Sequence, residues 1–523
     1  MSRKHPLSKN LFFNASTHLL ILAVFLVFQI LLIGVLSAYL QSISVPVMMG
    51  LYFLAMIMCM YVSVRHDNPS TKVFWILLIA VFPAFGILLY IMWGFPRHGK
   101  KRHSLEYRSQ QAATKALRDY ADESEQDTLP AKTDLSGIPS VRLISDYLKN
   151  QGFPVFRATG MKYYPSGESL FDDCLKDISR AKKTIFMSFF ICREGMLWDR
   201  FQKVLLKKAG EGLDIRVLLD DAGTMFSVSE KMARSFRKLG INVQFFNPTH
   251  RYLNNLYLNY RNHQKYIIID SNIGYTGGVN LSDEYANYTS PFGYWKDTGI
   301  RLTGRGVFGM SVSFINMWDQ THAILSDSYA EFRPSSPGSG RGICHVFDDG
   351  PLNNPQNTAE GIILRMIETA SSSVFITTPY LAVSQNFIDT LCRVAKSGVR
   401  ISLLLPWRLD HWYVFEVTRS HFLPLIESGV EIYRYLPGML HSKMIVVDDV
   451  HALIGSINLD NRSFYIQYED GVWLSGNLVV KDMRKDIEKS ISESTRVSID
   501  EIKKGGVVRN AFGLLLRIFS PMM

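Results

Sequence analysis

The sequence predicts an α/β protein made of two similar halves in a pseudo-twofold arrangement, preceded by N-terminal transmembrane helices. Two observations predict the halves: strand and helix patterns recur in the same order, and one polar signature occurs twice. The strongly apolar N-terminus predicts the membrane helices. A chain of 523 residues is long enough for several domains and a substantial core.

The N-terminal region contains three apolar runs, at 19–40, 45–64 and 73–93, and the first is long enough to cross a bilayer. A cleaved signal peptide does not fit, because the first run is too long and two more follow it. Basic residues flank the region on both sides, which places both flanks and the large C-terminal part in the cytoplasm. Two cytoplasmic ends require an even number of crossings. The sequence therefore leaves two or three crossings open, with one run re-entrant or interfacial.

After a charged linker, the pattern becomes that of a soluble α/β protein. In the first half, Thr184–Ile191 and Asp214–Asp220 are apolar runs that predict buried strands, separated by a helical stretch. The same order returns in the second half, where Ser373–Pro379 and Val399–Pro406 are the matching strands. We therefore expect an internal duplication.

The order of these patterns predicts the domain boundaries. They are 1–96 for the membrane region, 97–139 for the charged linker, 140–332 for the first half, 333–342 for a Pro/Ser/Gly-rich linker, 343–500 for the second half and 501–523 for a C-terminal segment. The C-terminal segment contains an apolar stretch, Val507–Phe519, that includes Arg509 and Arg517. It predicts either an interfacial membrane helix or a helix packed on the α/β region, and the sequence does not choose between them.

The composition limits the partners and the compartment. The formal net charge of +10 favours an anionic partner, either nucleic acid or an acidic membrane surface. The apolar N-terminus favours the membrane, so no nucleic-acid partner is expected. The five cysteines are scattered without pairwise spacing, which argues against a disulfide framework or a zinc site and fits a reducing compartment.

One polar signature carries most of the functional information. It consists of His, Lys, Asp and Asn at fixed spacing, with Gly-Gly or Gly-Ser shortly before the Asn. The two copies are His263, Lys265, Asp270 and Asn280, and His441, Lys443, Asp448 and Asn458. A lone His-x-Lys has little value, but agreement of every position in two copies indicates a duplicated functional site.

The spacing within each copy predicts where the side chains point. His and Lys are two residues apart beside an apolar run, so on a strand they share one face. The Asp stands at odd spacing from the Lys, which points it away and predicts a structural role for Asp270 and Asp448. The Asn follows a glycine turn, where backbone can approach a ligand closely.

Two His, two Lys and two Asn make a cationic site rich in hydrogen-bond donors. Such a site suits a phosphodiester, since charge develops on its non-bridging oxygens in the transition state. Two histidines on opposite sides of phosphorus supply an in-line nucleophile and a general acid. A further match of motifs aligns Asp297 with Glu469, and such a carboxylate can fix the tautomer of an imidazole. Neither a metal ion nor another cofactor is expected, because the Lys in each motif repels a cation.

With these residues the sequence resembles the phospholipase D superfamily, whose H-x-K-x4-D-x6-G-(S/G)-x-N signature appears here twice. The similarity to bacterial cardiolipin synthases is more specific. It includes the N-terminal stretch Asn68–Gly94, the segment Gly278–Tyr285 in the first half and the segment Gly455–Phe464 in the second. The resemblance covers the chain from residue 45 to the C-terminus and leaves out the run at 19–40.

The resemblance implies transfer of a phosphatidyl group from one phosphatidylglycerol to another, which gives cardiolipin and glycerol without a nucleotide or metal. It implies these roles: His263 as nucleophile, His441 as acid and base, Lys265, Lys443, Asn280 and Asn458 on the non-bridging oxygens, Asp297 and Glu469 as orienting carboxylates, and Asp270 and Asp448 completing the catalytic signature. It also implies a multi-pass cell-membrane enzyme whose partners are phosphatidylglycerol and other anionic phospholipids. From the residues alone, either histidine can be the nucleophile, because the two motifs are equivalent.

Other functions remain as alternatives. The sequence pattern does not identify which acceptor receives the phosphatidyl group. It therefore does not exclude another phosphatidyltransferase or a hydrolase of the phospholipase D type. A nuclease shares the chemistry of the site, but the apolar N-terminus argues against it. A non-catalytic membrane scaffold is disfavoured because both signatures are intact.

Overall fold

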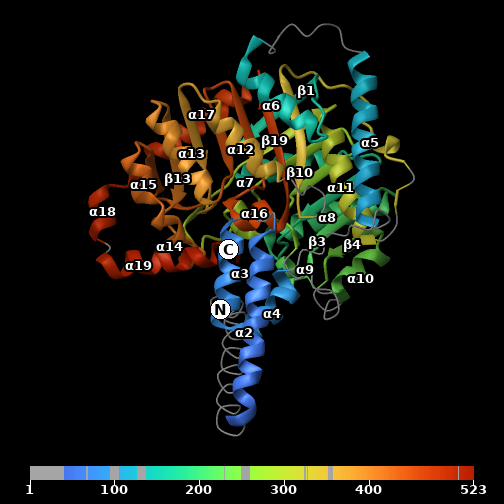
Figure 1. Cartoon of the computed structure of the whole chain (residues 1–523). Coiled ribbons are helices and arrows are strands. Elements are labelled where there is room, and N and C mark those ends of the chain that lie inside the picture. Colours follow the sequence, from blue (N-terminus) through green and yellow to red (C-terminus); the bar gives the residue numbers. More distant parts are fainter. Residues whose placement is uncertain are drawn as a thin grey trace, which may run out of the picture. The chain divides into compact units, whose positions relative to one another are not determined.

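The computed structural model describes residues 41–65, 69–94, 105–126, 137–225, 227–228, 230–248, 260–322, 325–326, 328–351, 357–504 and 506–522. The first predicted apolar run, 19–40, lies outside the described residues. The chain divides into two compact units, Met1–Arg97 and His98–Met523. Figure 1 shows the N-terminal helices in blue, and the strands and most helices of the larger unit in cyan to red.

The described part of the N-terminal unit is helical. It contains α2 (Gln41–Ser63), α3 (Pro69–Val81), α4 (Pro83–Leu89) and the π-helix η1 (Tyr90–Gly94). Among the described residues, Val45–Ser63 is the one segment long and apolar enough to cross a membrane, with a mean hydropathy of 2.0. This segment corresponds to the second predicted run.

The third predicted run, 73–93, does not form one continuous helix. Pro83 has no backbone N–H to donate, so α3 ends at Val81 and α4 begins a new helix. At about 1.5 Å per residue α3 is about 20 Å long, shorter than the roughly 30 Å apolar core of a bilayer. A β-carbon on Gly86 would lie 2.6 Å from the Cα of Ile79, so this glycine allows α4 to fold back against α3.

The larger unit contains two β-sheets with corresponding strand orders. The first has the order β1-β9-β7-β6-β2-β3-β4, and the second has the order β10-β19-β17-β16-β11-β13-β14-β20. The strands of the first sheet are β1 (Thr159–Tyr164), β2 (Thr184–Phe189), β3 (Asp214–Asp220), β4 (Ile241–Phe246), β6 (Tyr266–Ile269), β7 (Ile273–Gly277) and β9 (Gly299–Gly304). Those of the second are β10 (Ile343–Asp349), β11 (Ser373–Thr377), β13 (Arg400–Pro406), β14 (Glu431–Tyr435), β16 (Met444–Val447), β17 (His451–Gly455), β19 (Gln467–Ser475) and β20 (Ser494–Arg496). Apart from β20 the orders match strand by strand, which confirms the predicted duplication.

Helices cover both faces of the first sheet. α7 (Gly167–Ser179) and α8 (Met196–Gly210) pack on one face, and α11 (Val307–His322) packs on the other. Side chains alternate accordingly along β2: Phe186 lies in the apolar cluster with α11, and Ile185 lies in the cluster with α7 and α8. Burial on both faces explains why the central strands are continuous apolar runs in the sequence.

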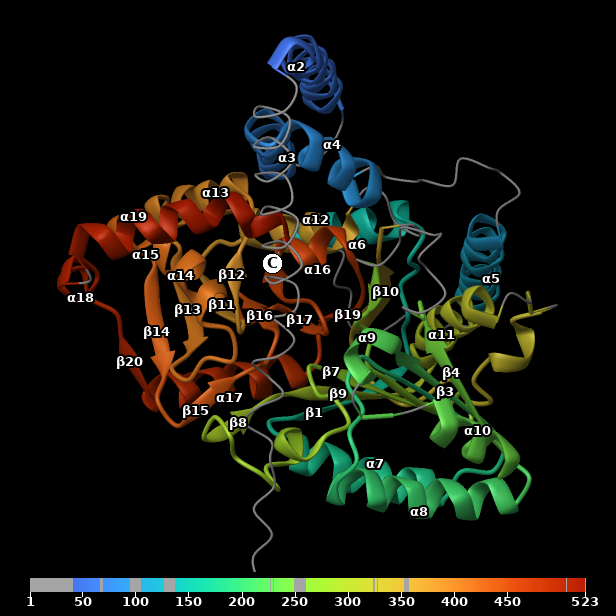
Figure 2. The same cartoon turned by 90° about the horizontal axis from the view of Figure 1, so that it is seen from below.

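The second half repeats this layered arrangement, as Figure 2 shows for the orange and red elements. Its sheet contacts α12 (Thr358–Glu368), α13 (Gln385–Lys396) and α17 (Val479–Ser492). The remaining helices and short strands of the unit are α5 (Leu105–Gln126), α6 (Pro139–Asn150), α9 (Asp221–Thr224), α10 (Glu230–Lys238), β5 (Arg261–Asn262), η4 (Asp283–Ala286), β8 (Tyr294–Lys296), η5 (Ala330–Phe332), β12 (Leu381–Ala382), α14 (Trp412–Ser420), α15 (Phe422–Glu427), β15 (Gly438–Leu440), β18 (Leu459–Asp460), α16 (Asn461–Tyr465), α18 (Ile499–Lys504), α19 (Gly506–Leu516) and η6 (Arg517–Met522). Part of the predicted charged linker is the helix α5, which packs on α11.

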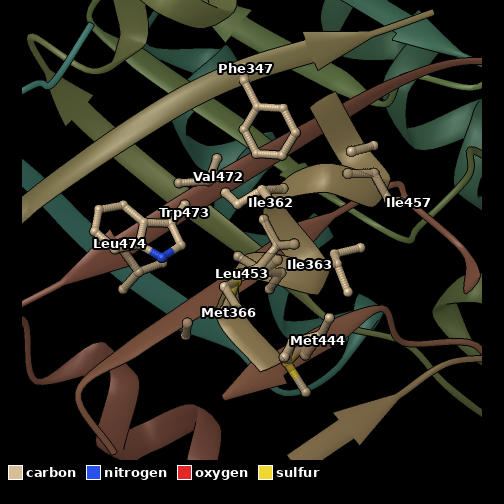
Figure 3. Packing of buried hydrophobic residues seen from close by; sticks show 14 of the residues in the cluster. Phe347, Ile362, Ile363, Met366, Met444, Leu453, Ile457, Val472, Trp473 and Leu474 are labelled. Atoms are coloured by element: carbon tan, nitrogen blue, oxygen red, sulfur yellow. The ribbon is translucent and has the colours of Figure 1, made fainter. Parts of the chain in front are cut away.

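One apolar cluster extends from the first half into the second. It contains Phe314 of α11 together with Phe347 of β10, Ile362 of α12 and Trp473 of β19. Figure 3 shows its part in the second half, where the ring of Phe347 lies near Val472, Ile362 and Ile457. Because the halves share this core, they cannot separate without exposing it to water.

We expect Phe347→Ala to lower the free energy of unfolding by about 3–5 kcal/mol, since the truncation removes a buried ring and leaves a cavity. Phe347 is 1% exposed, whereas Leu478, at 75%, offers a matched control. Leu478→Ala should change stability by no more than about 0.5 kcal/mol. Thermal unfolding of both variants in detergent measures the difference, and equal melting temperatures would contradict a shared core at β10.

Candidate active site

The two His-x-Lys motifs lie at equivalent points of the two halves. His263 and Lys265 lie between β5 and β6, and His441 and Lys443 lie between β15 and β16. β5 pairs in parallel with β19 of the second half, and β15 pairs in parallel with β8 of the first half. Each histidine therefore follows a strand that has added to the other half.

Backbone hydrogen bonds continue this exchange at the histidines themselves. The N–H of His263 donates to the carbonyl of Tyr468 at 2.8 Å, and the N–H of His441 donates to the carbonyl of Lys296 at 2.8 Å. Tyr468 precedes Glu469, and Lys296 precedes Asp297. The pairing of strands thus fixes each histidine beside a carboxylate of the opposite half.

The two imidazoles bind these carboxylates through Nδ1. Nδ1 of His263 lies 2.9 Å from both carboxylate oxygens of Glu469. Nδ1 of His441 lies 2.6 Å from Oδ2 of Asp297. A neutral imidazole that donates from Nδ1 carries its free lone pair on Nε2. The carboxylates expected to orient the imidazoles are therefore beside them, and the pairs cross between the halves.

The two signature lysines are buried beside the histidines. Lys265 Nζ donates to the carbonyl of His263 at 2.5 Å. Lys443 Nζ donates to the carbonyl of His441 and lies 2.9 Å from its Nδ1. Burial lowers the pKa of Lys265 to about 7 and that of Lys443 to about 8, because desolvation penalises an ammonium group. The two ammonium groups would stabilise a bound anion electrostatically, and little water is present at this buried position to weaken the interaction.

The imidazole and carboxylate of the first pair are both shifted toward their neutral forms. Burial, together with the charges of Lys265 and Lys443, lowers the pKa of His263 well below its usual value. Burial raises the pKa of Glu469 well above its usual value. Both directions follow from the cost of charge in a dry interior. The lowered pKa favours the neutral imidazole of His263, and where its Nδ1 donates to Glu469 the lone pair of Nε2 is left free.

The two signature asparagines differ in their hydrogen bonds. Asn280 Oδ1 accepts from the N–H of Ile191 at 3.0 Å, and its Nδ2 donates to the hydroxyl of Tyr285 at 2.8 Å. Asn458 Oδ1 is buried and has no partner among the described groups. The side chain of Asn280 therefore holds two chain segments together. The amide oxygen of Asn458 accepts no such hydrogen bond from the described groups.

Asp270 and Asp448 lie at the ends of β6 and β16 that are remote from the histidines. Asp270 Oδ1 accepts from the N–H groups of Lys183 at 2.6 Å and Thr184 at 3.0 Å, at the start of β2. Asp448 makes equivalent bonds at the start of β11. The odd spacing predicted that these carboxylates point away, and the structure does not bring them to the imidazoles. We therefore treat them as anchors of the strand pairs rather than as groups that touch the substrate, which corrects their inclusion among the catalytic residues.

Several polar groups at the site differ from the residues at the equivalent positions of the first half, and the sequence analysis gave them no role. Ser456 and Ser463 both donate to Glu469, Ser463 at 2.7 Å. Asp470 accepts from the N–H of Lys265 at 3.0 Å. The charge of Arg462 contributes to the lowered pKa of His263. The sequence could have indicated these residues only by their position, because they lie within or beside the matched segments of the second half.

Known protein families match both halves and the N-terminal region of the chain. A family described as "Cardiolipin synthase, PLD-like domain" matches residues 174–289 and 363–491, and one described as "Phospholipase_D-nuclease N-terminal" matches residues 50–94. A cardiolipin synthase of Oceanobacillus iheyensis is 31% identical over 446 residues, which cover 84% of this chain and 90% of that protein. The chain belongs to the cardiolipin synthase family.

Other relatives of this cardiolipin synthase family member match over similar lengths. An uncharacterized protein of Streptococcus mutans is 30% identical over 473 residues, covering 89% of this chain and 99% of the relative. The crystal structure of a phosphatidylserine synthase from Haemophilus influenzae matches with a TM-score of 0.54 and 13% identity, covering 73% of this chain and 100% of that one. The structural match shows that the fold is shared.

We expect Gly278→Ala to lower kcat by about 10²-fold, because a misplaced catalytic group of this kind costs about that much. A β-carbon at Gly278 would lie 2.1 Å from Oδ1 of Asp297 and would displace the carboxylate that holds His441. Gly210→Ala is the control, since a β-carbon at Gly210 meets nothing within 4 Å. Turnover and thermal unfolding should be measured together. Full activity of Gly278→Ala would contradict an orienting role for Asp297.

Proposed function

We propose that this chain is a membrane-bound cardiolipin synthase that moves a phosphatidyl group from one phosphatidylglycerol to another and releases glycerol. The observation that carries the proposal is the crossed pairing of His263 with Glu469 and of His441 with Asp297. The pairing gives one buried site two imidazoles in fixed tautomers and supports a pseudo-twofold arrangement of the halves. Membership of the cardiolipin synthase family supports the choice of phospholipid as substrate.

In the first step, Nε2 of His263 attacks the phosphorus of the donor. The N–P bond forms while the bond from phosphorus to the glycerol oxygen breaks, and protonated His441 gives its Nε2 proton to that oxygen. The two signature lysines and asparagines stabilise the charge on the non-bridging oxygens. The products are phosphatidyl-His263 and free glycerol.

In the second step, the hydroxyl of the acceptor phosphatidylglycerol takes the place of glycerol. His441, now neutral, accepts the hydroxyl proton while the oxygen attacks phosphorus and the N–P bond breaks. One phosphodiester has replaced another, so the reaction requires no nucleotide. His263 is free again, and His441 carries the proton needed for the next cycle.

The surroundings of the histidines support this division of roles. The pKa of His263 is lowered by burial and by nearby positive charges, which favours a neutral nucleophile. The pKa of His441 is also lowered by burial and by Lys443, but the Asp297 carboxylate opposes the shift. A bound phosphodiester anion raises both values, and His441 then has the carboxylate that stabilises an imidazolium.

The proposed enzyme is a multi-pass membrane protein with its catalytic region in the cytoplasm. α2 supplies one crossing, and the first apolar run, at 19–40, is expected from its sequence to supply another. The broken helices α3 and α4 fit a re-entrant or interfacial segment. Two crossings agree with the basic residues on both flanks of the membrane region.

A product assay tests the proposed reaction directly. Purified full-length protein with phosphatidylglycerol vesicles should give cardiolipin and glycerol, with or without EDTA. His263→Ala and His441→Ala should each lose at least about 10²–10⁴-fold in rate, the usual contribution of general acid–base catalysis. The exposed His322→Ala is the control. Phosphatidic acid without cardiolipin would identify a hydrolase instead, and normal turnover by either histidine variant would exclude the two-histidine mechanism.

The KM for phosphatidylglycerol should rise with pH. The pKa of Lys265 is about 7 and that of Lys443 about 8 in the free site, and a bound anion raises both. Binding is therefore strongest below pH about 7, where both ammonium groups are charged, and weakens as pH rises through these values. Steady-state kinetics across this range measures the effect. Lys265→Arg stays charged and should flatten the profile, whereas a pH-independent KM in the unsubstituted protein would contradict a phosphate-binding role for the lysines.

A further inference from the structure

The C-terminal helix α19 presents apolar residues on its outward side. Val507 and Val508 are 85% and 84% exposed, and Leu514 and Leu515 are 54% and 55% exposed. A helix on the surface of a domain in water normally turns its charged and polar residues outward. The outward side of α19 is therefore unsuited to contact with water.

Two polar residues of the same helix, Arg509 and Asn510, bond to side chains of α14. Arg509 Nε donates to both carboxylate oxygens of Glu416 at 3.0 Å. Asn510 Oδ1 accepts from Arg419 Nη2 at 2.8 Å. Leu516 packs beside the small apolar cluster under α14. The helix is thus fixed on α14 with its polar contacts inward, so both alternatives left open by the sequence are compatible: it packs on the domain and keeps an apolar side exposed.

The exposed apolar residues continue onto α14 and η6. The indole of Trp412 stacks on the ring of Phe512, with centroids 6.3 Å apart and planes inclined by 10°. We call this surface the C-terminal face; it consists of Trp412, Val507, Val508, Phe512, Leu514, Leu515 and Phe519. Single exposed apolar residues are ordinary, but a grouped set of this kind marks an interaction surface.

The C-terminal face adjoins the candidate active site. η6 follows α19 directly and contacts α16. Asn461 Nδ2, at the start of α16, donates to Ser520 Oγ of η6 at 3.3 Å. α16 comes directly after β18 and the turn that carries Asn458. One short helix therefore connects the surface to the proposed phosphodiester site.

The chemistry of the C-terminal face favours a lipid bilayer as its occupant. Exposed Lys503 and Lys504 end the preceding helix, α18, and complement acidic headgroups. The eleven residues of α19 form a rod of about 16 Å, too short to cross a bilayer but suited to lie in its interface. Trp and Phe beside basic residues are typical of such interfacial segments.

We propose that the C-terminal face inserts into an anionic phospholipid bilayer and holds the active site at the membrane interface, where lipid substrate enters. This rests on the proposed function, since a lipid substrate gives the site a reason to lie there. The insertion is separate from the N-terminal anchor, because α19 and η6 belong to the larger unit, and it sets the orientation of that unit at the bilayer. A fixed apolar surface beside the site provides that orientation.

Depth-dependent quenching tests the insertion in full-length protein. An environment-sensitive fluorophore is placed on Val508→Cys and Leu515→Cys, and on Leu478→Cys as control, because Leu478 is apolar and 75% exposed elsewhere on the unit. The labelled protein is reconstituted in phosphatidylglycerol vesicles with brominated acyl chains, and the signal of labelled unsubstituted protein is subtracted. Quenching at positions 508 and 515 but not at 478 is expected. Equal signals at all three positions, or burial of 508 and 515 in a second copy seen as a larger oligomer without quenching, would overturn the proposal.

An activity comparison tests the consequence. The double variant Phe512→Asp, Leu515→Asp should make cardiolipin about tenfold more slowly on phosphatidylglycerol bilayers, because charge resists insertion. On short-chain phosphatidylglycerol dispersed as monomers it should keep the rate of the Leu478→Asp control. Loss on both substrates, or on neither, would overturn the proposal. Absence of cardiolipin from the unsubstituted protein would contradict the proposed function instead, and the quenching result would still decide the insertion.

Discussion

Each imidazole of the site is held by a carboxylate from the opposite half, and the rest of the catalytic unit depends on this exchange. A buried carboxylate or imidazole without a partner would cost several kcal/mol of desolvation. Neither half can therefore bury its own His-x-Lys motif alone. The short strands β5 and β15 cross to the opposite half, and the shared core around α11 and β10 fixes the distance over which they cross.

The same exchange gives the site its electrostatic character. Burial lowers the pKa values of Lys265 and Lys443 and raises the pKa of Glu469, so all three groups favour their charged forms less than they would in water. The shifts of the two lysines cost stability in the empty site and are relieved when an anion arrives, because a nearby negative charge raises the pKa of an ammonium group. A phosphodiester is well suited to this role because its single negative charge lies on two oxygens, each able to accept hydrogen bonds.

The pseudo-symmetry is broken where the chemistry needs two different groups. Glu469 receives two serine hydroxyls, from Ser456 and Ser463, whereas Asp297 faces Gly278, where any side chain would collide with it. Asp297 is shorter than Glu469, and Gly278, which has no side chain, leaves room for its carboxylate. Both histidines contact a carboxylate, but Lys265, Lys443 and Arg462 lower the pKa of His263, whereas Asp297 opposes the lowering of the pKa of His441. A pair of identical motifs does not reveal this difference.

The sequence by itself determined the duplicated α/β frame, the two His-x-Lys motifs and the family resemblance, because buried strands and motif spacing are local properties of the chain. It also predicted, from odd spacing, that Asp270 and Asp448 point away from the histidines. Only the tertiary structure decided which carboxylate meets which imidazole, since the partners are far apart in sequence and are joined by strand exchange. It also decided that Arg509 and Asn510 of α19 bond to α14, because Glu416 and Arg419 on α14 provide partners that the sequence of α19 does not show.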